Sequence, residues 1–441
     1  MLGAVLSALV GCGSEKADRR IKLDYWEVWS GFERDAMQTL VDEFNASQDR
    51  IYVNFLSVSQ MERKLLLATA GGNPPDIAGM RSTDIALFAE NGALTPLDSY
   101  AAQYGIEGEN YLPAIWDLLN LHGRLWALPT TPGNSALHWN KRLFREAGLD
   151  PERPPRTIAE LEAFNDQITR FNAKGEIEVL GHLPQEPGWW QDMWVYWFGG
   201  ALWNGEDAIT ADDPRNRDAL EWMATYPERF GQDKLTAFRD LSGNFASPQN
   251  PFFRGRIAMV LQGTWMYNFI QNFAPEDFEW GVAPFPSVKL EDYGVNIVET
   301  NLLVIPKGAQ HPTEAFEFIA WMQQPKNLEK LNLLQRKFSP LVEVSTGFYQ
   351  KHPNPHIRIY RDLAAAPKAI SRPPLTTFVE YQADMINAYD AVIRQNATPE
   401  EALDAVQKRQ ERLFERMYNR WQKVKDTRQE EWAKVDAEVA Q

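Results

Sequence analysis

The stretch Phe252-Phe-Arg-Gly-Arg-Ile-Ala-Met-Val-Leu-Gln-Gly-Thr-Trp265 decides the fold of this 441-residue chain. Its apolar run, residues 257–261, is short and lies between two glycines, which predicts a buried strand. The residues after it have the pattern of a helix, with Thr264 as the predicted N-cap. Ligands of open α/β sheets bind beyond the carboxyl ends of the strands, so the pattern places Trp265 where a ligand would lie.

The composition is that of a globular protein, and its charge excludes some partners. Hydrophobic residues make up 44% and charged residues 24% of a chain long enough for two or three domains. A net charge of −15 argues against nucleic acid or an anionic membrane as the main partner. The six histidines lack the spacing of metal ligands, and no nucleophile–base pattern predicts catalysis, so we expect neither a metal, a cofactor nor an enzyme.

The N-terminal residues predict export and a lipid anchor. An apolar run, residues 1–10, is too short to span a bilayer but suits a signal peptide. Leu9-Val10-Gly11-Cys12 resembles the lipobox of bacterial lipoproteins, although no Lys or Arg precedes the run. The resemblance implies that the mature chain begins at Cys12, carries a lipid on that thiol, and lies outside the cytoplasm.

Strand and helix patterns alternate from residue 21 onward. Strands are expected at residues 21–26, 51–55 and 75–80, with helices between them, which predicts a mainly parallel sheet flanked by helices. A further strand at residues 125–129 is expected to stop at Pro129, before a loop over residues 130–135. Towards the C-terminus, Thr398 and Pro399 predict a helix start, and an apolar stripe continues from there to Val424.

Five dispersed segments together resemble the family 1 extracellular solute-binding proteins of ABC importers, to which the maltose-binding protein belongs. The resemblance implies two α/β lobes joined by crossing strands, a ligand in the cleft between them, and closure about a hinge. It also implies a membrane permease as partner, with an ATPase on another polypeptide because the chain has no P-loop pattern. The segments, in order, are Gly71-Gly-Asn-Pro-Pro-Asp-Ile77, Leu125-Trp-Ala-Leu-Pro129, residues 138–149, residues 252–265 and Ile305-Pro-Lys-Gly308.

The resemblance also implies a division of the chain. Residues 1–20 are expected to be a lipoprotein signal peptide and linker, residues 21–129 and 302–337 the first lobe, and residues 130–301 and 338–415 the second lobe. Residues 416–441 are predicted to be a charged helical extension that forms a solvated tail, in preference to a helix that faces a partner. The protein is expected to be a monomer.

Aromatic residues in loops indicate a carbohydrate ligand. The chain has 16 Trp, 14 Tyr and 23 Phe, and aromatic rings stack on the C–H faces of sugars while planar polar groups bind the hydroxyls. Trp194 and Trp197 follow helical spacing and are expected in the core. The resemblance implies further polar ligand contacts on the loops that line the cleft. The predicted ligand-binding residues are Trp29, Glu33, Arg81, Asp84, Asn134, Ser135, Glu186, Trp189, Trp190, Trp265, Asn301 and Arg336.

Two alternatives stay open. A secreted glycoside hydrolase would need two carboxylates roughly 5–10 Å apart, for which Glu186 and Glu299 are candidates. Within the family, a glycerol phosphate ester would need a cationic cleft, which Arg81 and Arg336 could supply. The sequence favours a lipid-anchored receptor that captures a carbohydrate, an oligosaccharide, and delivers it to a permease.

Overall fold

The computed structural model describes residues 19–186, 192–242 and 246–440. The first part of the described chain alternates strands and helices, as the sequence predicts. The apolar face of the first helix, with Leu40 and Phe44, is buried against the sheet. The elements of this part are β1 (Ile21–Glu27), α1 (Gly31–Ser47), β2 (Ile51–Ser57), α2 (Met61–Ala70), β3 (Ile77–Arg81), η1 (Ser82–Asp84), α3 (Ile85–Glu90), α4 (Asp98–Gln103), η2 (Gly108–Asn110), α5 (Pro113–Asp117), β4 (Asn120–Leu121) and β5 (Arg124–Leu125).

The next strand corrects the predicted loop. Residues 130–135 belong to β6 (Leu128–Asn140), a strand of 13 residues that are all buried. Pro129 and Pro132 lack the N–H group that a strand donates to its neighbour, which usually places proline at a strand end. Here the pairing of β6 with β11 is irregular, and side-chain amides bind backbone carbonyls of β6. The Nδ2 of Asn332 donates to the carbonyl of Thr130 at 3.0 Å, and the Nε2 of Gln323 donates to that of Pro129 at 3.1 Å.

The middle of the chain contains the stretch that opened the sequence analysis. The predicted buried strand is confirmed, since every residue of β9 (Ile257–Gly263) is buried. The predicted N-cap at Thr264 is wrong, because its N–H donates to the carbonyl of Asn134 in β6 and α11 begins at Met266. The other elements are α6 (Lys141–Glu146), α7 (Ile158–Ile168), β7 (Arg170–Phe171), β8 (Ile177–His182), α8 (Trp194–Trp197), α9 (Pro214–Phe230), α10 (Gln232–Asp240), α11 (Met266–Phe273), β10 (Trp280–Ala283) and η3 (Leu290–Asp292).

The last part returns through the sheet once and is otherwise largely helical. Strand β11 (Asn296–Val304) lies between β3 and β6 and is antiparallel to both. The short strand β12 pairs with the start of β11. The elements that follow β11 are α12 (Pro312–Gln323), α13 (Pro325–Gln335), α14 (Phe348–Lys351), α15 (Ile357–Ala365), β12 (Ala369–Ile370), α16 (Phe378–Ile393) and α17 (Pro399–Val439).

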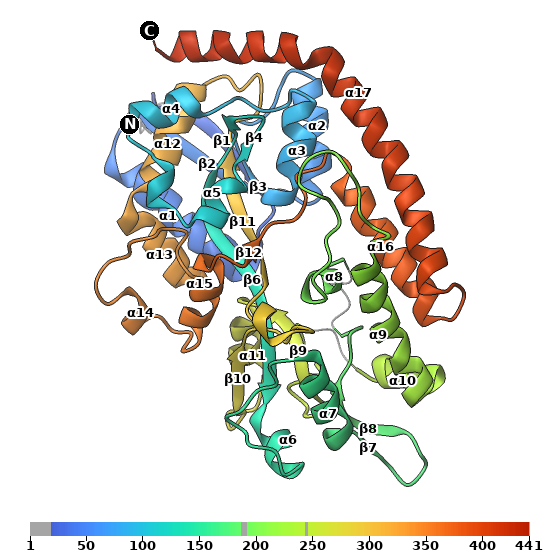
Figure 1. Cartoon of the computed structure of the whole chain (residues 1–441). Helices are drawn as coiled ribbons and strands as arrows, with labels where there is room; N and C mark the ends of the chain where they lie inside the picture. Colours follow the sequence, from blue (N-terminus) through green and yellow to red (C-terminus); the bar gives the residue numbers. More distant parts are fainter. Residues whose placement is uncertain (1–18, 187–191, 243–245, 441) are drawn as a thin grey trace, which may run out of the picture.

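Ten strands of the described residues form one sheet that runs through both lobes (Figure 1). Its order is β2-β1-β3-β11-β6-β9-β8-β7, with β10 beside β6 and β12 beside β11. The pairs β1–β2, β1–β3 and β8–β9 are parallel, whereas β6 and β11 are antiparallel to each other. The two long antiparallel strands therefore form a backbone link between the lobes.

Two large hydrophobic clusters define the lobes. The cluster of the first lobe contains Tyr25 and Trp126, and that of the second lobe contains Trp194 and Trp197. Both Trp194 and Trp197 are fully buried, as the helical spacing predicts. A third, smaller cluster joins Phe338 and α15 to residues of β6, β10 and β11.

The C-terminal helix contradicts the predicted solvated tail. Helix α17 is 41 residues long, and Thr398 caps it as predicted. Its first turns bury Leu403 and Val406 in the second-lobe cluster, while Trp432, near its end, is 4% exposed in the first-lobe cluster. Figure 1 shows the helix rising along one side of the molecule from the second lobe, then bending and passing over the first lobe to the C-terminus. The extension is helical, but it is docked.

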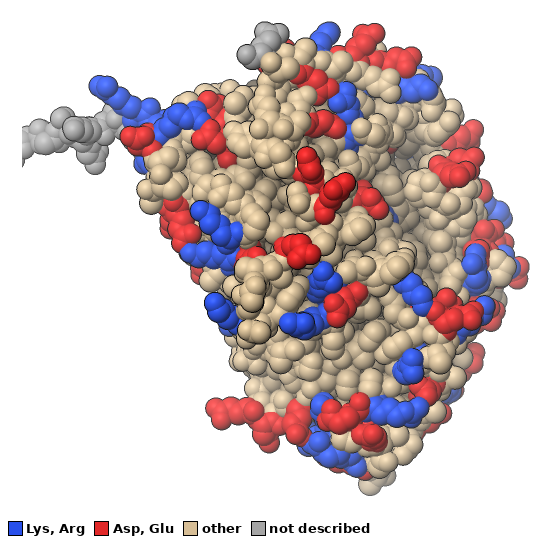
Figure 2. All heavy atoms as spheres, turned by 60° about the vertical axis from the view of Figure 1, so that its left-hand side comes forward, with Lys and Arg blue, Asp and Glu red and all other residues tan. Residues whose placement is uncertain are grey.

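Some predictions fall on residues that the structure does not describe. Cys12 and the signal segment lie outside the described residues, as do Trp189 and Trp190. Within the described part of the chain, no helix combines the length and the apolar character needed to cross a membrane. Figure 2 shows acidic and basic side chains interspersed over one face of the molecule, with no broad basic area there.

Candidate ligand-binding site

The indole of Trp265 lies directly on the crossing strand β6. A Cβ atom on Gly133 would be 3.4 Å from the Trp265 ring and 3.7 Å from a carboxylate oxygen of Glu299. A Cβ on Gly263 would come within 2.3 Å of the same ring. Gly263 leaves room for the indole, because a Cβ there would collide with the ring, whereas a Cβ on Gly133 would only touch it. The Trp265 ring and the Glu299 carboxylate therefore both lie beside Gly133 of β6.

Arg372 ties Glu299 to the second lobe. Its Nη1 donates to Glu299 Oε2 and its Nε to Asp192 Oδ2, both at 3.0 Å. Asp192 is fully buried and also accepts from Gln382 at 3.0 Å. Burial opposes the charge of Arg372, but the two carboxylates outweigh it and raise its pKa. Arg372 is thus a fixed cation between two carboxylates. Asp192 is buried, whereas Glu299 is partly exposed to solvent.

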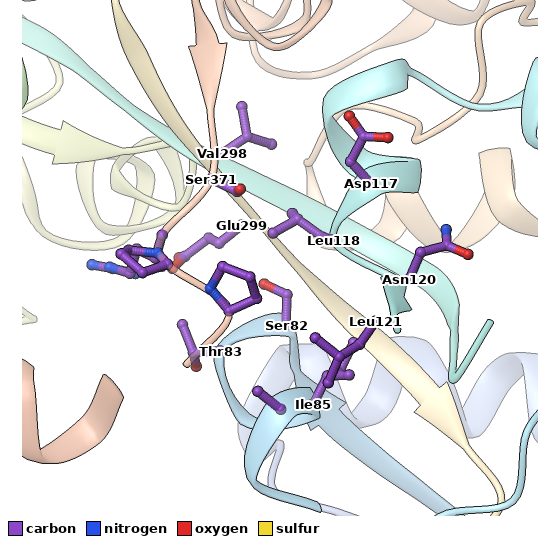
Figure 3. Close-up of a pocket in the computed structure, with 14 residues that line it drawn as sticks. Ser82, Thr83, Ile85, Asp117, Leu118, Asn120, Leu121, Val298, Glu299 and Ser371 are labelled. Carbon is purple, nitrogen blue, oxygen red and sulfur yellow. The ribbon is translucent and has the colours of Figure 1, made fainter. Parts of the chain in front are cut away.

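Two cavities open around Arg372, Ser371, Asp117 and the two prolines that follow Arg372, and they share these lining residues. The smaller lies between the lobes. Figure 3 shows Ser82 and Thr83 reaching it from the segment after β3, and Glu299 from β11. The larger has a volume of about 430 Å³, which falls in the usual range of about 300–1,000 Å³ for small-molecule sites.

The first-lobe candidates Trp29 and Glu33 lie together after β1. Trp29 is only 5% exposed and belongs to the first-lobe cluster. Glu33 forms a salt bridge of 3.0 Å with the buried Lys337, whose ammonium also lies 5.9 Å from the centre of the Trp29 ring. Trp29 is therefore packed more tightly than a loop position predicts.

Glu27, which sequence reasoning missed, lies at the end of β1 beside this group. Its two oxygens accept from the Tyr25 hydroxyl at 2.8 Å and the Val28 N–H at 2.9 Å. Burial, which exceeds the opposing effect of these hydrogen bonds, raises its pKa to about 7. The signal that could have found it is an acid at an alternate position that faces inward along an otherwise apolar strand.

The candidates after β3 are split between surface and interior. Arg81 is exposed and contacts Glu62 at 3.4 Å and Asp84 at 3.5 Å. Asp84 is buried, and burial raises its pKa against the opposing effect of Arg81. The neighbouring Ser82 and Thr83 line the inter-lobe cavity, whereas Arg81 and Asp84 do not appear in its lining.

Four other candidates lie along the crossing strands or at the end of α13. Asn134 and Ser135 are buried in β6, where Asn134 donates to the carbonyl of Tyr360 at 2.7 Å. Asn301 donates from β11 to Thr131 at 3.2 Å. Arg336 ends α13 with a φ of 58° and lies 5.7 Å from the centre of the Tyr267 ring in α11. The amides of Asn134 and Asn301 thus brace the link between the lobes.

Glu186 precedes the undescribed residues 187–191. Burial raises its pKa to about 7, although Arg239 opposes the shift. Within the described residues, no group of three or more His, Cys, Asp or Glu side chains is arranged to hold a metal ion. The site thus combines an indole, carboxylates, hydroxyls and one paired guanidinium.

A family comparison decides what this architecture is. The model of the bacterial extracellular solute-binding proteins matches residues 33–329. The chain belongs to this family. The match spans β6, β9 and β11, and thus both crossing strands and Trp265. The two lobes and the antiparallel link between them are accordingly the two-lobed fold of periplasmic binding proteins.

Individual relatives of this solute-binding protein differ in the ligand they are named for. The sn-glycerol-3-phosphate-binding periplasmic protein of Pectobacterium atrosepticum is 21% identical, with 93% of this chain and 95% of that protein covered. The maltotriose-binding protein of Pyrococcus abyssi is 22% identical, with 73% of this chain and 66% of that protein covered. Both relatives are binding proteins, but they are named for different ligands. They therefore support a binding role without identifying the ligand.

Solved structures share the fold closely. CpMnBP1 with mannobiose bound is 26% identical, has a TM-score of 0.77, and covers 88% of this chain and 99% of its own. The sugar-binding protein MalE of Xanthomonas citri is 22% identical, with a TM-score of 0.76, and covers 91% and 98% of the two chains. The second likeness shows the fold alone.

Proposed function

We propose that this protein captures an oligosaccharide between its lobes and delivers it to the permease of an ABC importer. The observation that carries the proposal is the Trp265 indole beside the Glu299 carboxylate on the crossing strands. An indole stacks on the C–H face of a pyranose, and a carboxylate accepts hydrogen bonds from its hydroxyls. Closure of the lobes would bury both contacts at once.

The charges around the cavities favour a neutral sugar over a phosphate ester. Arg372 already pairs with two carboxylates, and Arg81 pairs with Glu62 and Asp84. A phosphate dianion near Arg372 would meet the solvent-facing carboxylate of Glu299, and like charges repel. The structure of CpMnBP1 holds a mannose disaccharide, which also supports a sugar.

A glycerol phosphate ester remains the second candidate. The similarity to the sn-glycerol-3-phosphate-binding protein extends over nearly the whole of both chains. A hydrolase is tested alongside it, because the raised pKa of Glu186 is a property that a general acid requires. We propose no catalytic role.

The proposal includes the location of the protein. The lipobox-like residues that end at Cys12 support a lipid anchor on an extracytoplasmic surface. The described chain starts at the first lobe (Figure 1), so the anchor would hold that lobe nearest the membrane. A monomer with the predicted boundaries of the lobes, at residues 129/130 and 301/302, completes the proposal.

Titration followed by tryptophan emission tests the ligand class. The protein is mixed with manno- and malto-oligosaccharides and with sn-glycerol-3-phosphate, and the same mixtures are assayed for new reducing ends. Trp265→Ala should weaken sugar binding about tenfold or more, as expected of a central aromatic contact, whereas Phe171→Ala, an exposed ring of β7, should not. Saturation by the phosphate ester alone would overturn the sugar, and accumulation of reducing ends would overturn the receptor.

A further inference from the structure

A third cavity extends the cleft as far as helix α17. Its volume is about 380 Å³. It shares Leu121 and Pro374 with the small inter-lobe cavity, and Trp203 and Pro374 with the larger one. The three cavities are therefore neighbours that follow one another from the Arg372 group to α17. The residues of α17 that line the third cavity are Phe414, Met417, Tyr418, Trp421 and Gln422.

The wall that α17 supplies is aromatic. Phe414 and Tyr418 stack with ring centres 6.0 Å apart, and Tyr418 is 49% exposed. Trp421 stacks on His122 of the first lobe at 4.1 Å with an interplanar angle of 12°. Trp203 faces them from the second lobe and also lines the middle cavity. Rings presented by three elements around one cavity provide stacking platforms for sugar rings.

The polar groups of this cavity suit hydroxyls. Its lining holds two carboxylates, Glu90 and Glu206, and the amide of Gln422, with neither Lys nor Arg among the described residues that form it. The indole N–H of Trp203 has no hydrogen-bond partner within the described part of the chain. Glu90 bonds to His122 of its own lobe at 2.9 Å and to Thr376 across the gap between the lobes. A phosphate would find no positively charged partner here other than protonated His122.

We propose that the cavity against α17 is a distal subsite that binds the outer glycosyl units of an oligosaccharide whose first units lie near Glu299 and Arg372. The inference rests on the proposed function and adds to it a preference for longer chains. The neighbouring cavities mark the direction in which a longer chain would extend, and the aromatic wall with its carboxylates supplies the contacts. The α17 wall of this subsite lies beyond residue 329, where the family match ends, whereas His122 and Trp203 on the opposite sides lie within the matched part.

Calorimetric titration of the whole protein with a series from di- to hexasaccharide tests the subsite. The series is chosen from the sugar class that the emission titration identifies, and affinity should rise with chain length until the series of cavities is filled. Tyr418→Ala should weaken binding of the longest chains about two- to tenfold, the range of a single aromatic stacking contact. It should leave disaccharide affinity unchanged, and Tyr418→Phe should restore the long-chain affinity. Phe171→Ala is the control, since that ring is also exposed but lies on β7.

The outcomes separate the two proposals. Sugar binding with an affinity that is independent of length, or an equal loss for all lengths in Tyr418→Ala, overturns the distal subsite and leaves the receptor intact. A wild-type protein that binds none of the sugars overturns the receptor, and the subsite with it. Because Tyr418 is half exposed, its truncation removes little buried area, and circular dichroism of the variant checks that the fold is retained.

Discussion

Two of the links between the lobes are held in different ways. The crossing strands β6 and β11 are hydrogen-bonded to each other, and all 13 residues of β6 are buried. Helix α17 has no buried residue between Gln410, on the second lobe, and Trp432, on the first. One link is buried along its length, whereas the other rests on the second lobe over its first turns and on the first lobe from Trp421 onward.

The difference bears on how the lobes can move. A pair of buried strands can act as a hinge, because small backbone rotations there turn one lobe against the other. Since the ends of α17 dock on different lobes, such a rotation must bend the helix or release one of its ends. Helix α17 therefore limits how far the cleft opens, and the following changes test the two links separately.

The largest effect is expected at the first-lobe end of α17. Trp432 packs edge-on against Trp126 at 5.0 Å and beside Trp421 at 6.0 Å. Trp432→Ala should lower the free energy of unfolding by about 3–5 kcal/mol, the usual cost of removing a buried Trp. Urea unfolding measures the loss, and trypsin should cut the released end after Lys425 or Arg428. Leu67→Ala, on an exposed apolar residue of the first lobe, is the control and should change stability by less than about 0.5 kcal/mol. Equal stability of the two variants would contradict the docked end.

This docking was not predictable from local sequence, whereas most of the sheet was. The strands β1, β2, β3 and β9 follow from short apolar runs between turn residues, a pattern contained within each segment. Trp432 lies in a run of mixed charges, and its burial depends on Trp126, about 300 residues away. Arg372 and Asp192, which the sequence analysis missed at the site, are likewise 180 residues apart. Their only local signal is a lone cation among prolines and an acid beside buried tryptophans.

The second largest effect is expected from Glu27, a buried acid of the first lobe that lies in neither link. The pKa of Glu27 is about 7 in the folded protein, against about 4.3 for an unperturbed Glu. Between these values the unfolded chain loses a proton that the folded protein keeps, so stability falls as pH rises. At about 1.4 kcal/mol per unit of pKa difference, the fall is on the order of 4 kcal/mol. Glu27→Gln should abolish this fall, because the amide stays neutral.

Denaturant unfolding at several pH values between 4 and 8 measures the difference between Glu27→Gln and the wild type. The groups that act on the carboxyl are Tyr25, Val28, Glu33 and Lys337, and the variant leaves them in place. If the links make the two lobes unfold together, a single unfolding transition should move to a different denaturant concentration as the pH changes. A shift confined to one of two separate transitions would show that the links do not couple them, and an unchanged pH slope would contradict the buried acid.

A smaller effect is expected at the hinge. Asn332 is fully buried and donates to the carbonyls of Thr130 at 3.0 Å and Leu328 at 2.8 Å. Asn332→Ala leaves the carbonyl in β6 without that donor, which should cost about 1–3 kcal/mol. Exchange of the β6 amides, followed by mass spectrometry, should rise at residues 128–135 and remain unchanged in α17. Asn91→Ala, whose half-buried amide donates within α3, is the control. Equal exchange in the two variants would show that the amide does not brace the hinge.

The smallest effect is expected at the polar contacts of the docked helix end. Asp436 accepts from Arg124 and from the Ser99 hydroxyl, both at 2.6 Å, and all three side chains keep some contact with water. Partly exposed ion pairs contribute about 0.2–1 kcal/mol and weaken as salt rises. Asp436→Asn should therefore lower stability within that range at low salt and by less at 1 M salt. A loss as large as that of Trp432→Ala would mean that charge rather than the buried indole holds the end of α17. The helix would then release the first lobe as ionic strength rises, while the crossing strands would be unaffected.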